Sequence, residues 1–165
     1  MTRLADGETR RLAEFTVPSE PGNERLVLAR VADAVADRGL SARSLDRLKT
    51  AVAETAMNAI EHGNRNRSEL PVRVEVDMAG QEIVVAVTDL GGDRDGGGGA
   101  GREPVEPDLD LKLVGGQSPR GWGLFLIRHM VDAIDETTQG TWHTVRLVMR
   151  IATVSEQDGT EGDAR

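Results

Sequence analysis

The sequence predicts an α/β protein with two layers, in which a mixed, mainly antiparallel sheet is covered on one face by three helices. Residues 71–78 alternate strictly between apolar and polar side chains, and residues 82–88 repeat this strand pattern after a turn at 79–80. Residues 44–63 instead place their apolar side chains at the spacing of a helix. With 165 residues, the chain is long enough to form one domain with a sizeable core.

The first third of the chain is expected to form one strand and two helices. Residues 11–17 alternate enough for a strand. Asn23 is a candidate N-cap for a helix that Gly39 would stop, and Ser44 is a candidate N-cap for a long helix that ends at Gly63. The apolar positions that recur in the first of these helices are Leu26, Ala29, Val31, Ala34 and Val35.

The hairpin at 71–88 is followed by a glycine-rich segment, with seven glycines from Gly91 to Gly101. Only about fifty patterned residues follow it, too few for a second core, so a mobile loop inside one domain is favoured over a linker. A short helix at 109–113, a helix at 124–134 and a final strand at 141–151 complete the expected elements.

The expected organisation is a flexible N-terminus at 1–10, one folded domain at 11–151 and a disordered acidic tail at 152–165. The net charge of −8, without a cluster of Lys or Arg, disfavours nucleic-acid binding. The absence of cysteine excludes disulfides and thiolate metal sites. The longest aliphatic run, 83–87, is far shorter than the ~20 residues of a membrane span, so we expect a soluble, cytoplasmic protein.

Three polar residues of the long predicted helix, Glu54, Asn58 and His62, are spaced i, i+4, i+8 and would stack on its polar face. For any one of them, a solvated helix face is the simpler interpretation. As a set they have specific chemistry, because an asparagine oxygen ligates Mg²⁺ without repelling phosphates. A glutamate one turn away can orient or deprotonate an attacking hydroxyl.

Two glycine motifs follow in order. Asp89 and Gly91 come directly after a predicted strand, where a carboxylate can accept an exocyclic adenine amine and a glycine lets a flat base approach the backbone. Gly121 and Gly123 come before a predicted helix, whose N-terminus would face phosphate oxygens, and Arg120 is a candidate phosphate contact. Each motif alone also fits a turn or a cap; their order predicts a nucleotide site.

The segment Glu54-Thr-Ala-Met-Asn58-Ala-Ile-Glu-His62-Gly63 resembles the N-box of the Bergerat-type (GHKL) ATPases, which include gyrase, MutL and histidine kinases. It is most similar to the N-box of their small anti-sigma-factor serine kinases, Glu-x-x-x-Asn-Ala-x-x-His-Gly. The resemblance covers roughly residues 11–151 and implies the Bergerat ATPase fold.

The remaining motifs resemble the family's other sequence boxes. Asp89-Leu-Gly91 resembles the first glycine box, and Gly121-Trp-Gly123 resembles the second. Gly140-Thr141, with Thr144 on the last predicted strand, is similar to the family's closing element.

The resemblance implies roles for these positions. Glu54 would be the catalytic base and Asn58 the Mg²⁺ ligand. Asp89 would bind the adenine of ATP with support from Thr144, and Gly91 would form the floor of the base pocket.

The resemblance also implies how the phosphates and the partners are bound. Gly121 and Gly123 would wrap the phosphates, and residues from about 93 to 120, Arg120 included, would form a mobile lid over ATP. Proteins of this kind are usually homodimers that sequester a sigma factor and phosphorylate a serine on an anti-anti-sigma partner of the STAS type.

The sequence leaves three functional interpretations open. An ATP- and Mg²⁺-dependent serine protein kinase that is also an anti-sigma factor explains why Glu54 stands beside Asn58. A nucleotide-gated binding module without kinase activity is favoured by Asp93, which stands where the family commonly has the second glycine of the first box. An α/β sandwich with coincidental caps and turns is disfavoured by the order of the four motifs. A sensor histidine kinase is also disfavoured, because the helix before the N-box lacks a phospho-acceptor histidine.

Overall fold

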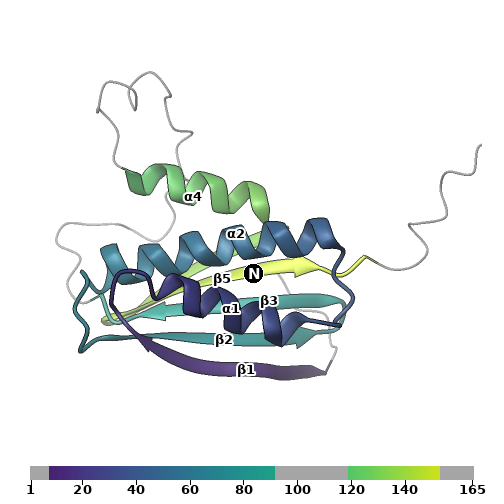
Figure 1. The fold of residues 1–165 in the computed structure, drawn as a ribbon, viewed down its shortest axis with the longest axis horizontal. Helices are drawn as coiled ribbons and strands as arrows, with labels where there is room; N and C mark the ends of the chain where they lie inside the picture. Colours follow the sequence, from purple (N-terminus) through teal and green to yellow (C-terminus); the bar gives the residue numbers. More distant parts are fainter. Residues whose placement is uncertain (1–7, 92–118, 153–165) are drawn as a thin grey trace, which may run out of the picture.

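The structure, a computed structural model, describes residues 8–91 and 119–152 of the chain (Figure 1). Five strands form one sheet in the order β1-β2-β3-β5-β4, and each neighbouring pair is antiparallel. The strands are β1 (Thr9–Pro18), β2 (Pro71–Ala79), β3 (Glu82–Asp89), β4 (Ala133–Gln139) and β5 (Trp142–Arg150). The helices are α1 (Glu24–Val35), α2 (Ala42–Asn58), its π-helical continuation η1 (Ala59–Gly63), and α4 (Pro119–Met130).

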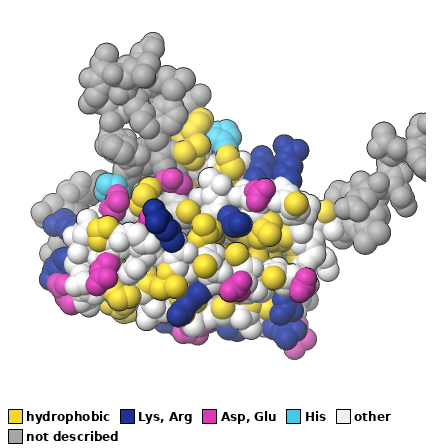
Figure 2. All heavy atoms as spheres, in the orientation of Figure 1, with side chains coloured by type: hydrophobic (Ala, Val, Ile, Leu, Met, Phe, Trp, Pro, Cys, Tyr) yellow, Lys and Arg dark blue, Asp and Glu magenta, His cyan; other side chains and the backbone are white. Residues whose placement is uncertain are grey.

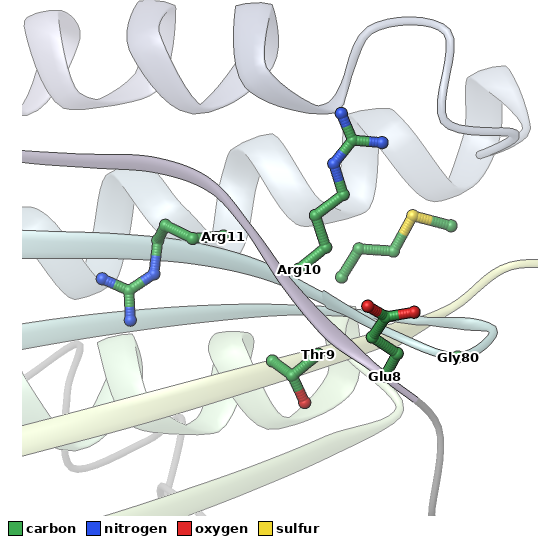
Figure 3. Close-up of a pocket in the computed structure, with 6 residues that line it drawn as sticks. Glu8, Thr9, Arg10, Arg11 and Gly80 are labelled. Carbon is green, nitrogen blue, oxygen red and sulfur yellow. The ribbon is translucent and has the colours of Figure 1, made fainter.

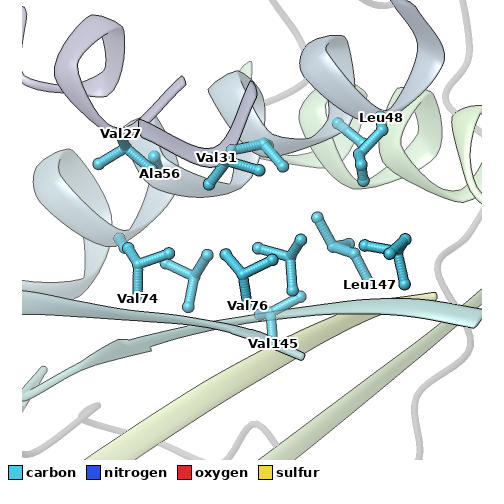
Figure 4. Close-up of a cluster of buried hydrophobic side chains, with 14 of the residues drawn as sticks. Val27, Val31, Leu48, Ala56, Val74, Val76, Val145 and Leu147 are labelled. Atoms are coloured by element: carbon cyan, nitrogen blue, oxygen red, sulfur yellow. The ribbon is translucent and has the colours of Figure 1, made fainter. Parts of the chain in front are cut away.

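The predicted fold class is confirmed: within residues 8–91 and 119–152, three α-helices cover one face of the sheet (Figure 1). The core between the two layers is built from aliphatic side chains, as expected for a chain with only two Phe and two Trp. Figure 4 shows helix residues such as Val31 and Leu48 facing strand residues such as Val76 and Leu147. Burying each such side chain stabilises the fold by about 1.5–3 kcal/mol.

The two N-terminal helices begin differently from the prediction. Ser41, and not Ser44, caps α2, because its side chain accepts a hydrogen bond from the Ser44 N–H at 3.1 Å. Asn23 precedes α1 but does not cap it with its side chain, which donates to the Pro18 carbonyl at 2.8 Å. Val31 and Val35 of the predicted apolar stripe are buried, whereas Leu26 is 43% exposed and Val27 is buried in its place. The buried residues of α1 are Val27, Val31 and Val35.

Strand β4 was not predicted, and the expected helix at 124–134 is wrong at its C-terminal end. Helix α4 stops at Met130, and the backbone of Asp132 donates to the Val148 carbonyl at 2.9 Å. The Asp132 carboxylate then accepts a hydrogen bond from the Arg150 N–H at 2.7 Å. These two bonds join the chain to the edge of β5. Ile134, which was expected at the end of a helix, therefore lies in a strand paired with β5. The expected short helix at 109–113 lies outside the described residues.

The charged side chains on the face of β2 turned away from the helices are paired with those of β1. Arg11 donates to Asp77 at 2.5 Å and also contacts Glu14, while Arg73 donates to Glu14 at 2.6 Å. The hydrogen bond to Asp77 raises the pKa of Arg11. Figure 2 shows acidic and basic side chains interspersed on the visible surface. On the side of the molecule that Figure 2 shows, the described residues present no long basic track.

A hollow lies where β1 begins, beside the turn between β2 and β3 (Figure 3). Its lining includes Glu8, Arg10, Met78 and Gly80. Because β3 starts beside this turn and ends at Asp89, the hollow and Asp89 lie at opposite ends of the strand.

No helix within residues 8–91 and 119–152 combines the length and the apolar character needed to cross a membrane.

Candidate functional site

The end of the N-box and the first glycine box meet at the carboxylate of Asp89. This side chain is on the last residue of β3 and is almost fully buried, with the residue 3% exposed. A Cβ atom built on Gly63 would lie 2.5 and 2.7 Å from the two carboxylate oxygens, and one built on Gly91 would lie 2.6 Å from Oδ1. We call Gly63 and Gly91 the glycine cradle. Only glycine leaves room for the carboxylate at either position.

Both oxygens of Asp89 have identified partners. Oδ1 accepts a hydrogen bond from the Gly91 N–H at 2.9 Å, and Oδ2 lies 3.1 Å from Nδ1 of His143. The Nε2 atom of His143 in turn contacts Oε1 of Glu136 on β4. His143 stands opposite Asp89 in the register of β3 and β5 and is 7% exposed. The interaction of Asp89 with His143 was not predicted, although a histidine beside the closing motif was visible in the sequence.

Thr144 lies on the other face of the sheet from Asp89. Its hydroxyl is 2.8 Å from the hydroxyl of Thr88, the residue opposite it on β3. Because successive side chains of a strand point to opposite faces, Thr144 and Thr88 share one face while His143 and Asp89 share the other. His143, and not Thr144, is therefore the residue of β5 that contacts Asp89. The role of Thr144 in supporting adenine stays a prediction.

Asn64 joins the N-box to the first glycine box and was missed as a site residue. It is 1% exposed, and its Oδ1 accepts a hydrogen bond from the Leu90 N–H at 2.8 Å. Its amide nitrogen donates to Ser19 at 2.9 Å and to the Pro71 carbonyl at 3.1 Å. The signal in the sequence was an asparagine directly after the N-box glycine. Its side chain can accept a hydrogen bond from one backbone segment and donate to another.

Glu54 and Asn58 lie one turn apart on α2, as predicted, and both are half-buried. Within the described residues, no hydrogen bond or ion pair engages either side chain, so both are available to a ligand. His62 is exposed and lies in η1, where the Asn64 N–H bonds the Ala59 carbonyl, five residues back. The turn that carries His62 is therefore wider than the α-helical turns that carry Glu54 and Asn58.

The second glycine box lies at the beginning of α4. The backbone of Arg120, Gly121 and Gly123 belongs to this helix, which starts at Pro119, and not to a turn before it. The expected helix start at 124 is therefore five residues too late. The expected lid at about 93–120 lies outside the described residues except for its last two positions.

The described arrangement suits a flat ligand with a hydrogen-bond donor. A buried carboxylate at the end of a strand is a strong acceptor, and the two glycines of the cradle let the chain pack directly against it. No group of three or more His, Cys, Asp or Glu side chains in the described ranges could hold a metal ion. A cation here would depend on the Asn58 oxygen together with ligand oxygens, which is a mode of binding typical of Mg²⁺ with phosphates.

The sequence was compared with protein families and with curated proteins. The family described as "Histidine kinase-like ATPase domain" matches residues 17–149. An anti-sigma F factor from Clostridium beijerinckii is 35% identical over 78 residues, which is 47% of this chain and 53% of that protein. One from Clostridium botulinum is 30% identical over 84 residues, which is 51% of this chain and 57% of that protein. The matched region thus spans about half the length of these curated relatives.

Solved structures share the fold at low sequence identity. The RsbU and RsbW domains of a Mycobacterium tuberculosis protein align with a TM-score of 0.59 at 19% identity, over 84% of this chain and 32% of that one. The SiaB–SiaC complex from Pseudomonas aeruginosa gives a TM-score of 0.57 at 16% identity, over 85% of this chain and 90% of the other. The resemblance drawn from the N-box and glycine boxes is confirmed: the chain belongs to the family of histidine kinase-like ATPase domains.

Proposed function

We propose that this protein binds ATP and Mg²⁺ and acts as an anti-sigma factor and serine protein kinase. Its substrate would be a serine on an anti-anti-sigma partner of the STAS type, in a partner-switching pathway. The observation that carries the proposal is the buried Asp89 carboxylate held in the glycine cradle at the end of the N-box. Burying an ionised carboxylate costs free energy, and a ligand that donates a hydrogen bond to it would explain why one is kept there, which supports the proposal.

Each site residue has a distinct task in this proposal. Asp89 accepts the exocyclic amine of adenine, and Gly91 lets the ring approach the backbone. Asn58 ligates Mg²⁺ through its neutral side-chain oxygen. Glu54, one turn earlier, orients the serine hydroxyl of the partner protein and removes its proton as the hydroxyl attacks.

Three residues at the start of α4 are proposed to bind the phosphates. Gly121, in the first turn of the helix, brings a backbone N–H group towards phosphate oxygens. Gly123, without a side chain, leaves room for them, and Arg120 adds a positive charge. ATP supplies the phosphoryl group and the negative charge that these donors balance.

The choice of partners follows from the relatives. Two curated relatives are named anti-sigma F factors, which supports sigma-factor binding by this chain. The SiaB–SiaC structure is a complex between two proteins, in agreement with a regulator that works by holding another protein. We further propose a cytoplasmic homodimer, because the chain resembles serine kinases that work in that form.

A second candidate is a nucleotide-gated binding module that does not phosphorylate its partner. Asp93 favours it, because it stands in the sequence where the family commonly has the second glycine of the first box. Both candidates require nucleotide binding, and only the first requires a base at Glu54.

The proposal is tested in two stages. Isothermal titration of the purified protein with ATP and Mg²⁺ should show binding in the micromolar range, and no heat with any nucleotide would contradict both candidates. The protein is then incubated with radiolabelled ATP and a STAS-domain protein from the same genome. Label on a serine of that protein supports the kinase; nucleotide-dependent binding without label supports the second candidate.

A further inference from the structure

His143 lies between two carboxylates that come from the strands on either side of it. Its Nδ1 is 3.1 Å from Oδ2 of Asp89 on β3, and its Nε2 contacts Oε1 of Glu136 on β4. Glu136 pairs with Val145 in the sheet, so it reaches His143 along the diagonal between neighbouring strands. The side chain of His143 is 9% exposed and that of Glu136 is 50% exposed. The three residues form a chain from the buried carboxylate to the surface.

This arrangement constrains the protons of the ring. A neutral imidazole has one N–H, whereas an ionised carboxylate only accepts hydrogen bonds. The contact with Asp89 is therefore a hydrogen bond when Nδ1 of His143 carries a proton. In that form His143 donates to Oδ2 while the Gly91 N–H donates to Oδ1, so the Asp89 carboxylate is held from both sides.

A carboxylate held in this way still has acceptor capacity. Each carboxylate oxygen has two lone-pair directions, so an oxygen that accepts one donor can accept another. The Gly91 N–H and His143 contribute to the rotation of the carboxylate, and this rotation decides where a further donor is best accepted. Without the donor from His143, the buried carboxylate would lose a charge-assisted bond and its orientation.

We propose that His143 is a positioning residue for base recognition: it holds the Asp89 carboxylate in the orientation in which Asp89 accepts the exocyclic amine of adenine. The preference of the site for adenine over a purine without that amine then depends on His143. This inference rests on the proposed nucleotide function. It assigns His143 no contact with the base and no part in phosphoryl transfer.

Two amide variants separate the two nitrogens of the ring. In His143→Asn, the amide nitrogen takes the place of Nδ1 and still donates to Asp89. In His143→Gln, the amide nitrogen takes the place of Nε2, on the side of Glu136. Both variants remove the ring from the same buried position, so both lose its packing. Only the Asn variant keeps a donor to Asp89.

The measurement is the affinity for ATP and for purine riboside 5′-triphosphate, the same nucleotide without the amine, each with Mg²⁺. Wild type should prefer ATP by about tenfold or more, the value of one hydrogen bond to a charged group. His143→Gln should reduce this preference about fivefold or more, and His143→Asn should keep it within about twofold of wild type. Glu136→Gln, at a half-exposed side chain, provides a variant that tolerates substitution and should reduce the preference in the same direction.

The outcomes distinguish this inference from the proposed function. Equal weakening of both nucleotides in His143→Gln, with the preference for ATP unchanged, would mean that His143 is only structural and would overturn the inference. Equal loss of preference in the Asn and Gln variants would overturn it as well. If wild type shows no preference and Asp89→Ala binds ATP as wild type does, the proposed base site itself fails.

Discussion

Oδ1 of Asn64 accepts a hydrogen bond from the backbone N–H of Leu90 at 2.8 Å, and this bond crosses from the last turn of the N-box to the residue after Asp89. The same side chain donates to Ser19 and to the carbonyls of Leu70 and Pro71. One buried amide therefore ties together the end of η1, the loop that follows it and the end of β3. This set of bonds holds Gly63 and Asp89 against each other.

Replacing Asn64 by Ala should destabilise the protein by about 2–3 kcal/mol, because buried partners of its amide lose their hydrogen bonds. Urea denaturation followed by circular dichroism gives the free energy of unfolding. Gln81→Ala, which removes an exposed amide, is the control and should change this free energy by less than about 0.5 kcal/mol. Equal stability of the Asn64 variant and wild type would show that these bonds are replaced by water.

Replacing Asp89 by Ala should remove an adenine contact worth about 1–3 kcal/mol and weaken ATP affinity from several-fold to more than a hundredfold. Isothermal titration of the two proteins side by side measures the difference. The matched control is Asp135→Ala, which removes an exposed carboxylate from β4 and should leave ATP affinity unchanged. An Asp89 variant with the affinity of wild type would place Asp89 outside the site.

Replacing Gly91 by Ala should lower ATP affinity while the protein stays folded. The added Cβ would stand 2.6 Å from Oδ1 of Asp89 and 3.0 Å from the Gly63 carbonyl, so the carboxylate must rotate away from the orientation in which it accepts the base. Gly80→Asn is the control: Gly80 has a φ of +58°, which asparagine tolerates, and open space around it. We expect at least a fivefold difference in ATP affinity between the two variants, the value of about one hydrogen bond.

Replacing Glu54 by Ala should slow phosphoryl transfer by roughly 10²- to 10⁴-fold and leave ATP affinity nearly unchanged, because a general base acts on the reaction and not on nucleotide binding. Single-turnover transfer to the partner protein and titration with ATP measure the two effects separately. Glu61→Ala, at an exposed glutamate of η1, should behave as wild type does. Equal transfer rates in wild type and the Glu54 variant would exclude Glu54 as the base and favour the binding module.

Replacing Asn58 by Ala should weaken ATP affinity in Mg²⁺ but have little effect in excess EDTA, because the lost oxygen acts through the metal. Titrations of both proteins under both conditions form a complete cycle. A metal-dependent loss of about tenfold in affinity is expected, comparable to other ligands of a bound metal. The same loss with and without Mg²⁺ would instead indicate that Asn58 contacts the nucleotide directly.

The expected helix of the N-box and the expected hairpin are both present. An apolar period of 3.6 residues gives one apolar face only in a helix, and a period of 2 residues does so only in a strand. The prediction that Glu54 and Asn58 share one side of a helix depends on local geometry alone, and it is confirmed. Strand β4 was missed because its sequence, with mostly exposed side chains, has no strong period of its own. Strand β4 forms because the backbone N–H and C=O groups at the edge of β5 bind it.

The sequence by itself determined the order of the motifs, the family to which they belong and the carboxylate at the end of β3. Only the tertiary structure decided which residue of β5 stands beside that carboxylate. Thr144 and His143 are neighbours in the chain, and a shift of one residue in strand register exchanges the two faces of a sheet. The register is determined by the pairing of β3 with β5, which are separated by more than fifty residues in the chain. The pattern of apolar and polar residues within either strand does not predict it. The same pairing brings His143 to Asp89 and leaves Thr144 against Thr88 on the other face.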